Sequence, residues 1–318
     1  MKNIKKLPFL LSILSLLTIF APANADVKVV TSIKPIHSLT SYLMDGVGKP
    51  DLIVDGYASP HGFALKPSHA KMLQNADLIF WVGEDLENFL EKPLKSIAKK
   101  AEKIELMEIK GLNKLKFRER NIFEEHDDHG HDEHAKKEDD HDDHGHDEEG
   151  HKEDDHDDHA KKDDDHDDHG HDEEGHKEND QKNEAKYKEN LKKAHNDLDK
   201  LTKKVKSELN KDFKSIVFHD AYQYFEKRFD VNVLGAFTVN TDVLPGAEQL
   251  SKIREIIEHD KVSCVFSEPQ FNPDIINAVA KDMNIKTGVL DPLGSNLTSG
   301  KTLYFDLIGN MSKSFRGC

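Results

Sequence analysis

An acidic segment rich in histidine, residues 124–178, limits the fold of this chain more than any other feature. It holds 28 Asp and Glu, 14 His and 6 Lys, so its net charge is 6 − 28 = −22. The string HDDHGHDEEGHKE occurs at 141–153 and again at 166–178, which indicates an internal duplication. A segment whose apolar side chains are alanines cannot bury a core. The sequence therefore predicts a disordered tract over 124–183, with structured parts on either side.

The charge of the remaining chain excludes some functions. The whole chain carries −16, so the residues outside 124–178 sum to −16 + 22 = +6. The dominant field is negative and would repel phosphates, which argues against nucleic-acid binding. No apolar run reaches the roughly 18 residues of a membrane helix, which argues against membrane insertion.

The N-terminus has the pattern of a secretory signal peptide. Three lysines precede an apolar stretch over 7–21, and Ala23-Asn24-Ala25 follows as a small-x-small cleavage site. We expect cleavage after Ala25 and export to a bacterial periplasm. A short membrane anchor is the alternative, although the apolar stretch is too short to span a bilayer.

Strand-like and helix-like signals alternate on both sides of the tract. Strands are expected at 27–33, 51–55 and 77–83 in an N-terminal lobe over 26–123, with a helix starting near 67. Such alternation predicts βαβ units and parallel sheets. A C-terminal lobe over 211–318 has expected strands at 215–219, 231–239, 262–267 and 286–290, with helices at 246–259, 273–283 and 302–315. Between the lobes, 184–210 predicts one long helix.

That helix is predicted from one apolar face. Apolar residues recur there at steps of four and three, and lysines cover the other face. They are Tyr187, Leu191, Ala194, Leu198, Leu201 and Val205. The two cysteines of the chain, Cys264 and Cys318, come later. In an oxidising compartment they are expected to form a disulfide, with two free thiols as the alternative.

The tract is predicted to bind metal ions. Imidazole is the commonest protein ligand for zinc, copper and nickel, and His-Asp-Asp-His spacing lets a flexible chain wrap one ion. Several moderate, exchangeable sites are expected, because ordering the tract costs entropy. A solvated spacer and a pH sensor are the alternatives. The expected low-affinity ligands are His126, His129, His131, His134, His141, His144, His146, His151, His156, His159, His166, His169, His171 and His176.

Two histidines outside the tract follow expected strands. His61 lies in the loop after 51–55, and His219 closes 215–219. Ligands of open α/β sheets bind beyond the carboxyl ends of strands, which is where both would lie. His37 stands at a strand-to-helix turn; taken singly, each of the three is more often structural than a ligand. The histidines expected on helix surfaces are His69, His195 and His259.

Enzyme signatures are missing from the sequence. It contains no G-x-S-x-G, H-E-x-x-H, Walker A or G-x-G-x-x-G string. A metallohydrolase could use Asp220 or Glu268 as a base, but no motif supports it. A binding protein is therefore favoured over an enzyme.

Seven strings outside the tract resemble the periplasmic zinc-binding proteins of bacterial zinc ABC importers (the ZnuA type, within the cluster A-I metal-binding proteins). They are TSIKPIHSL (31–39), SPHGFALKPSHAKMLQNADLIFWVG (59–83), VFHDAYQYFEKRF (217–229), VLGAFTVN (233–240), PGAEQLSKIREII (245–257), CVFSEPQFNP (264–273) and LDPLGS (290–295).

The resemblance implies two Rossmann-like lobes joined by a rigid helix, with Zn²⁺ in the cleft between them. It implies zinc delivery to a membrane permease, and a Cys264–Cys318 disulfide. The family's histidine ligands fall on His61 and His219, and its acidic position falls on Asp291, as a ligand or behind the ligands. A second nitrogen ligand favours zinc over manganese. Imidazoles must lose their protons to bind, so affinity is expected to fall below about pH 6.5.

One family feature is missing here. A third histidine, in a string like H-x-W-L with its own helix, has no counterpart, since the tract runs directly into KNEAKYKENLKKAH at 182–195. A tract histidine or water would then complete the site. This loss leaves two hypotheses open: a monomeric zinc-capture subunit of an importer, or a periplasmic zinc buffer that no longer feeds a permease.

We expect deletion of 124–178 to reduce zinc uptake when zinc is scarce, because the tract would collect zinc and pass it to the cleft. Uptake of radioactive zinc in chelator-treated medium measures the effect. Unchanged uptake would contradict the collecting role and favour sensing of high zinc instead.

Overall fold

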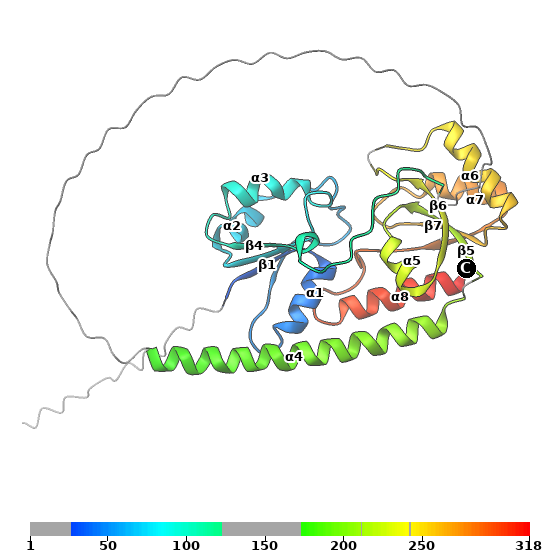
Figure 1. The fold of residues 1–318 in the computed structure, drawn as a ribbon. Helices are drawn as coiled ribbons and strands as arrows, with labels where there is room; N and C mark the ends of the chain where they lie inside the picture. The colour runs from blue at the N-terminus through cyan, green and yellow to red at the C-terminus, as the bar shows by residue number, and fades with distance from the viewer. Residues whose placement is uncertain (1–26, 123–172, 211, 242) are drawn as a thin grey trace, which may run out of the picture.

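The computed structural model describes residues 27–122, 173–210, 212–241 and 243–318. The expected signal peptide and the tract up to residue 172 lie outside the described residues. Within them, two α/β lobes lie side by side along one long helix, α4 (Glu173–Glu208), as Figure 1 shows. The predicted fold class is confirmed.

The first lobe is a four-stranded parallel sheet in the order β2-β1-β3-β4. Its elements are β1 (Val29–Ile33), α1 (Lys34–Leu43), β2 (Asp51–Val54), α2 (Pro67–Asn75), β3 (Leu78–Trp81), α3 (Asn88–Ser96), β4 (Glu102–Glu105) and the 3₁₀ turn η1 (Leu106–Glu108). Strand β4 was not predicted, because its EKIE sequence lacks an apolar run. It forms a charged edge strand, which discourages pairing with other chains.

The second lobe repeats this order as β6-β5-β7-β8, again all parallel. Its elements are β5 (Lys214–His219), α5 (Gln223–Phe229), β6 (Asn232–Thr238), α6 (Ala247–His259), β7 (Cys264–Ser267), α7 (Asp274–Met283), β8 (Lys286–Val289) and α8 (Leu303–Gly317). One apolar cluster packs α5 and α8 on the sheet, and a second packs α6 and α7 on it. Both faces are therefore covered, as a parallel sheet requires.

Helix α4 begins eleven residues before the predicted start at 184. Residues 173–183 include three Glu and two Lys, which favour helix without needing a core, and Glu184–Lys188 is an ion pair one turn apart. The predicted apolar face is also wrong at Leu191, which is 47% exposed. Asn190 takes the inward position and donates to the carbonyls of Leu43 and Asp45, at 2.8 and 2.9 Å.

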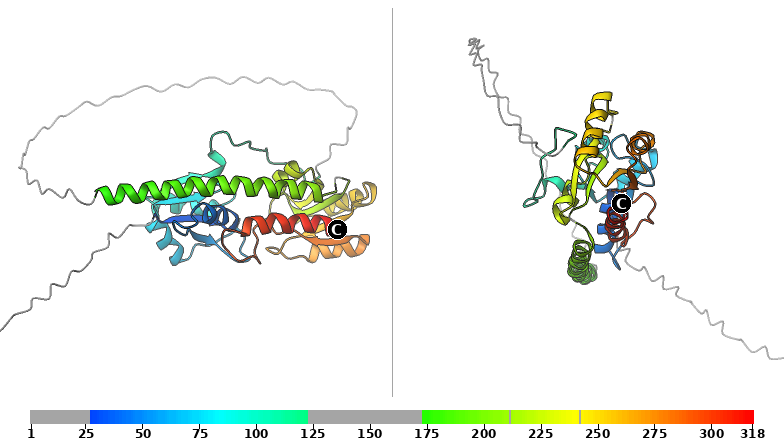
Figure 2. Two further views of the ribbon diagram at one scale, coloured as in Figure 1. Left: turned by 90° about the horizontal axis from the view of Figure 1, so that it is seen from below. Right: turned by 90° about the vertical axis from the view of Figure 1, so that its right-hand side faces the viewer.

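Helices α1 and α8 lie end to end beside α4 and join the lobes (Figure 2). The Tyr42 hydroxyl of α1 donates to Asp197 of α4 at 2.6 Å. At the start of α8, the amide of Tyr304 donates to the Ser38 hydroxyl at 2.9 Å. Helices packed on the sheets thus make one set of contacts between the lobes.

A buried lysine adds a direct bond between the lobes. Lys34, at the start of α1, is 4% exposed, and its ammonium donates to the carbonyls of Ser295 and Leu297 at 3.1 and 2.7 Å. Asp55 lies 3.5 Å from the same ammonium. A buried charge needs such partners, so this contact favours one relative placement of the lobes.

The segment before the tract crosses from the first lobe to the second. Ile122 forms an antiparallel bridge with Gly235 of edge strand β6, and the Asn121 carbonyl accepts from the Ala236 amide at 2.8 Å. A Cβ at position 235 would lie 2.6 Å from the Asn121 carbonyl oxygen, so the approach requires glycine. The tract therefore leaves the structure from the second lobe and re-enters at α4, beside the first (Figure 1).

Arg118 anchors this segment to the second lobe through two ion pairs. Its guanidinium lies 2.8 Å from a carboxylate oxygen of Asp220 and 2.6 Å from one of Glu226, whose side chains are 6% and 9% exposed. Burial raises the pKa of Glu226 above its ordinary value, and the ion pair with Arg118 opposes that rise. The arginine thus compensates two carboxylates that the fold has removed from water.

Cys264 of β7 and Cys318 at the end of α8 form a disulfide, with Cα atoms 5.6 Å apart. This confirms the expected pairing.

No described helix has both the length and the apolar composition that a membrane span needs.

Replacing Arg118 by Met should lower the free energy of unfolding by about 3 kcal/mol at pH 7.5, because two buried carboxylates lose their cation. The raised pKa of Glu226 should rise further. A raised folded pKa stabilises the protonated folded form, so the variant should regain stability as the pH falls towards about 5. Urea denaturation at both pH values measures this. The control is Arg316→Met, whose ion pair with Glu208 is more exposed; equal effects of the two changes would contradict the assignment.

Replacing Cys318 by Ser should destabilise the protein by up to about 4 kcal/mol, since the disulfide closes a loop with a sequence separation of 54 residues. Urea unfolding with and without reductant measures it. Reductant should lower the stability of the parent chain to that of the variant and leave the variant unchanged. A parent chain insensitive to reductant would show that the crosslink does not stabilise the fold.

Candidate metal centre

Parallel pairing brings two side chains together at the carboxyl edge of the second sheet. Strand β5 pairs with β7 in the register Ser215↔Cys264 and Ile216↔Val265. Continued along both strands, this register sets His219 opposite Glu268. Strand β5 has β6 on one side and β7 on the other, so this is where the strand order reverses, the usual ligand position of such sheets.

His219 and Glu268 are hydrogen-bonded, with Nδ1 2.6 Å from Oε1. The His219 side chain is 12% exposed and that of Glu268 is 1% exposed. In neutral histidine, a proton on Nδ1 leaves the lone pair on Nε2. This pattern of carboxylate, imidazole and metal is frequent in zinc proteins, because the carboxylate holds the ring and makes it a better ligand.

Aromatic residues surround the His219 ring. The ring centre of Phe271 lies 5.6 Å away and that of Tyr222 lies 6.4 Å away, both in edge-on arrangements. Tyr222 is 1% exposed, and burial, together with the Glu268 carboxylate, raises the pKa of its hydroxyl well above the ordinary value. The tyrosine thus stays neutral near pH 7 and adds no charge beside the imidazole.

His61 comes from the first lobe and faces His219. It lies in the exposed loop after β2, where its amide donates to the Ser59 hydroxyl at 3.3 Å. The two imidazole rings are 5.9 Å apart between centres and nearly perpendicular, at 87°. Two imidazoles on one tetrahedral zinc have ring centres roughly 5 Å apart, given Zn–N bonds of about 2.0–2.1 Å. The observed separation is about 1 Å longer than that value.

Asp291, the third predicted ligand, already accepts five hydrogen bonds. Three come from backbone amides, at 3.2, 3.0 and 2.6 Å, and two come from side chains, at 3.3 and 2.8 Å. The carboxylate thereby shapes the turn whose carbonyls bind Lys34. The donors are the amides of Leu293, Gly294 and Ser295, the Ser295 hydroxyl and the Gln270 side chain.

Across the described residues, no three His, Cys, Asp or Glu side chains come together as a metal-binding group. The pair of histidines is thus the part of the expected centre that this structure brings together. The 14 tract histidines lie outside the described side chains; His176 falls within the helical backbone of α4.

The other histidines have structural surroundings. His37 lies 3.1 Å from the Pro50 carbonyl through Nε2, and desolvation lowers its pKa. His195 and His259 are exposed on α4 and α6, as predicted. The expectation for His69 is wrong: it is 8% exposed, and its Nδ1 accepts from the Lys66 amide at the start of α2, at 3.2 Å. The helix needs an acceptor there, and His69 supplies it.

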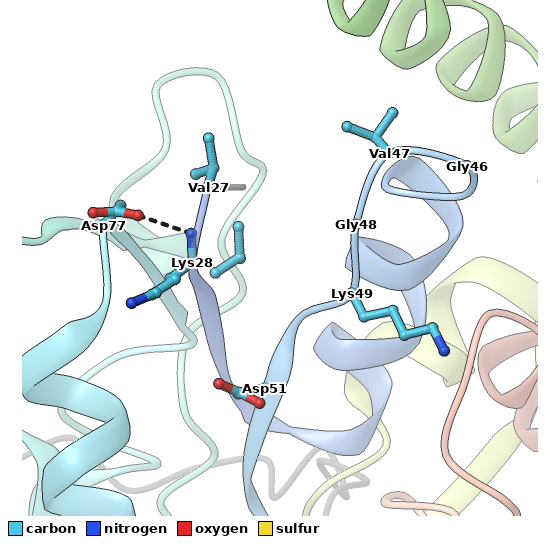
Figure 3. Close-up of a pocket in the computed structure, with 9 residues that line it drawn as sticks. Val27, Lys28, Gly46, Val47, Gly48, Lys49, Asp51 and Asp77 are labelled. Carbon is cyan, nitrogen blue, oxygen red and sulfur yellow. Dashed lines mark hydrogen bonds between the residues drawn. The ribbon is translucent and has the colours of Figure 1, made fainter. Parts of the chain in front are cut away.

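A surface hollow of about 870 Å³ lies far from this centre. Figure 3 shows it at the amino ends of the first-lobe strands, where Lys28, Lys49, Asp51 and Asp77 line it. Asp77 accepts from the Lys28 backbone amide at 2.8 Å. Ligands of such sheets bind at the opposite edge, so the hollow is not a candidate centre.

Sequence reasoning considered Glu268 only as a possible base and missed its bond to His219. A signal was present, since Glu268 directly follows an expected strand, as His219 ends one. Local sequence patterns do not determine the order of strands in a sheet. The sequence therefore could not show that these two strands are neighbours.

Comparison with known proteins gives consistent results. Residues 29–318 match the family model "ZnuA: Zinc-uptake complex component A periplasmic". The high-affinity zinc uptake system protein ZnuA of Brucella abortus (strain 2308) is 41% identical over 304 residues, covering 91% of each chain. That of Yersinia pestis is 35% identical over 314 residues, covering 96% of this chain and 95% of the relative.

Solved structures share the fold. A crystal structure of ZnuA superposes with a TM-score of 0.62 at 16% identity, covering 91% of this chain and all of the other. A Mn-bound periplasmic metal binding protein from Candidatus Liberibacter asiaticus has a TM-score of 0.63 at 17% identity, covering 90% of this chain and 97% of the other. The family match extends through both lobes, so this chain belongs to the ZnuA family of periplasmic zinc-uptake components.

Proposed function

We propose that this protein captures Zn²⁺ in the periplasm and delivers it to the membrane permease of an ABC importer. The observation that carries the proposal is the pair His61 and His219, one from each lobe, with rings 5.9 Å apart. A ligand held by both lobes can be released when they separate, which suits capture followed by delivery. Binding rather than catalysis is the role of this site.

Nitrogen ligands favour zinc over manganese. Zn²⁺ prefers His and Cys, whereas Mn²⁺ prefers carboxylate and water oxygens. A Mn-bound protein has a similar fold, so the donor atoms rather than the fold must select the metal. Two imidazoles facing each other supply that preference here.

Zinc prefers four ligands in a closed site and keeps water in an open one. We propose that water or a tract histidine completes the centre. Asp291 as a ligand stays a prediction, and zinc would have to compete with its five hydrogen bonds. The tract histidines are proposed as weaker, exchangeable sites that collect zinc.

The cellular setting follows from the family. A periplasmic component must be exported, and we propose that cleavage after Ala25 releases a monomeric protein that docks on its permease. The runner-up function is a zinc buffer without a permease, favoured by the missing H-x-W-L string. A knockout strain separates them: the importer subunit is needed for growth at scarce zinc, the buffer for tolerance of excess zinc.

The position of the tract ends determines how the tract should be tested. Ile122 pairs with β6 in the second lobe, and α4 starts at the far end of the molecule (Figure 1). Deletion of 124–178 would also pull one of these anchors out of place, so a fall in zinc uptake after deletion has to be compared with a variant of full length. Replacing the 14 tract histidines by Asn keeps the length and removes the imidazoles.

We expect one tight zinc site that survives this replacement. In the same background, His61→Ala and His219→Ala should each weaken it by more than about 100-fold, because a side chain that binds the ion contributes more than one that only holds a ligand in place. Asp291→Ala should cost less. Competition of Zn²⁺ against a strong chromogenic chelator at pH 7.4 measures all four proteins, and His195→Ala, exposed on α4, is the matched control.

Loss of tight binding on tract replacement alone would contradict this assignment. It would show that the tract supplies a required ligand or is itself the site, and the buffer function would then lead. Retention of tight binding by both His61→Ala and His219→Ala would exclude the cleft site.

A further inference from the structure

We propose that Glu268 is the positioning residue of the zinc site: its carboxylate holds the His219 ring in the tautomer and orientation that present Nε2 to the metal. This inference rests on the proposed function, because it assumes that His219 binds zinc. It assigns a role to a residue that would not touch the ion.

The first support is geometric. The distance of 2.6 Å between Nδ1 and Oε1 is short for a hydrogen bond, as expected when one partner is charged. Glu268 is 3% exposed, so water competes little for its oxygen. A short bond to a buried anion fixes the ring far better than an exposed contact would.

The second support is the rigidity of the carboxylate itself. Glu268 follows β7, which lies in the sheet between β5 and β8, and its carbonyl accepts from the Phe271 amide at 3.2 Å. Phe271 in turn packs against the His219 ring. The imidazole is therefore held at Nδ1 by the carboxylate and along its edges by aromatic rings.

The third support is the absence of a competing role for this carboxylate. Another carboxylate, Asp220, directly follows His219 in sequence. It is paired with the Arg118 guanidinium at 2.8 Å, so Glu268 is the carboxylate that holds the ring. The second oxygen of Glu268, Oε2, is buried and has no hydrogen-bond partner among the described residues. The hydrogen bond that Glu268 makes through Oε1 goes to the imidazole, and the other group beside the carboxylate is the Tyr222 hydroxyl, which stays neutral.

The chemistry explains why an anion is useful there. Zinc withdraws electron density from the imidazole and makes its Nδ1–H more acidic. A carboxylate acceptor stabilises that polarised ring, so the metal and the anion strengthen each other through it. An amide in the same place would accept the hydrogen bond without the charge.

The first test measures zinc affinity in the full chain with competing chelator. Glu268→Gln keeps the shape and removes the charge, and Glu268→Met also removes the acceptor. Each should weaken the tight site by about 10–100-fold, the usual effect of losing an outer-shell partner. The matched control is Glu226→Gln, another buried carboxylate of the same lobe whose partner is Arg118; its zinc affinity should stay within about twofold of the parent.

The second test needs no folded variant of Glu268. In zinc-free parent protein labelled with ¹⁵N-histidine, the His219 signals, assigned by their loss in His219→Ala, should show the proton on Nδ1. A proton on Nδ1 would show that the carboxylate accepts from this ring, and the zinc affinities of the Glu268 variants then show whether metal binding depends on that bond. A proton on Nε2 would overturn the proposal.

The affinities separate two kinds of failure. If both Glu268 variants bind zinc as tightly as the parent while His219→Ala does not, Glu268 is not a positioning residue but the cleft site stands. If His219→Ala also binds as tightly as the parent, the proposed site itself is wrong. Equal losses in Glu226→Gln and Glu268→Gln would reduce the effect to the general loss of a buried carboxylate.

Discussion

The site of this protein depends on parallel strand pairing. Parallel strands place all their carboxyl ends at one edge of a sheet, so residues far apart in sequence meet there. In the second lobe, the pairing of β5 with β7 sets His219 beside Glu268 across 49 residues of sequence. In the first lobe, the same edge carries the loop after β2 that presents His61. Neither lobe alone offers two facing imidazoles.

The facing arrangement of His61 and His219 also depends on how the two lobes are placed relative to each other. Lys34 bonds across the lobes through its buried ammonium, and Asp291 shapes the turn that receives it. Leu293 of the same turn packs against the apolar core of the first lobe. The helices α1, α4 and α8 add a packed layer away from the site. These contacts together hold the two lobes so that the rings of His61 and His219 face each other with their centres 5.9 Å apart.

The tract joins this framework at two separate places. Ile122 pairs with the edge strand of the second sheet. Arg118 forms an ion pair with Asp220, the residue after His219, and so anchors the same segment. Helix α4 resumes at the other end of the molecule (Figure 1). The family's H-x-W-L string and its helix are missing, and the segment that precedes the tract is bound to the second lobe. The tract is thus connected to both lobes in a chain similar to these relatives over 91% and 96% of its length.

The sequence by itself determined the local features. Repetition and charge identified the tract, and alternation identified two parallel α/β lobes. Strand ends and family strings predicted His61 and His219 as the candidate ligands. Each of these patterns extends over a few neighbouring residues, so it can be recognised without knowing the fold. The tertiary structure decided which distant residues meet: the bond of Glu268 to His219, the reach of Lys34, the hydrogen bonds that occupy Asp291, and the choice of Asn190 over Leu191 for the inner face of α4. Those outcomes depend on strand order, register and the packing of lobes, which local sequence patterns do not encode.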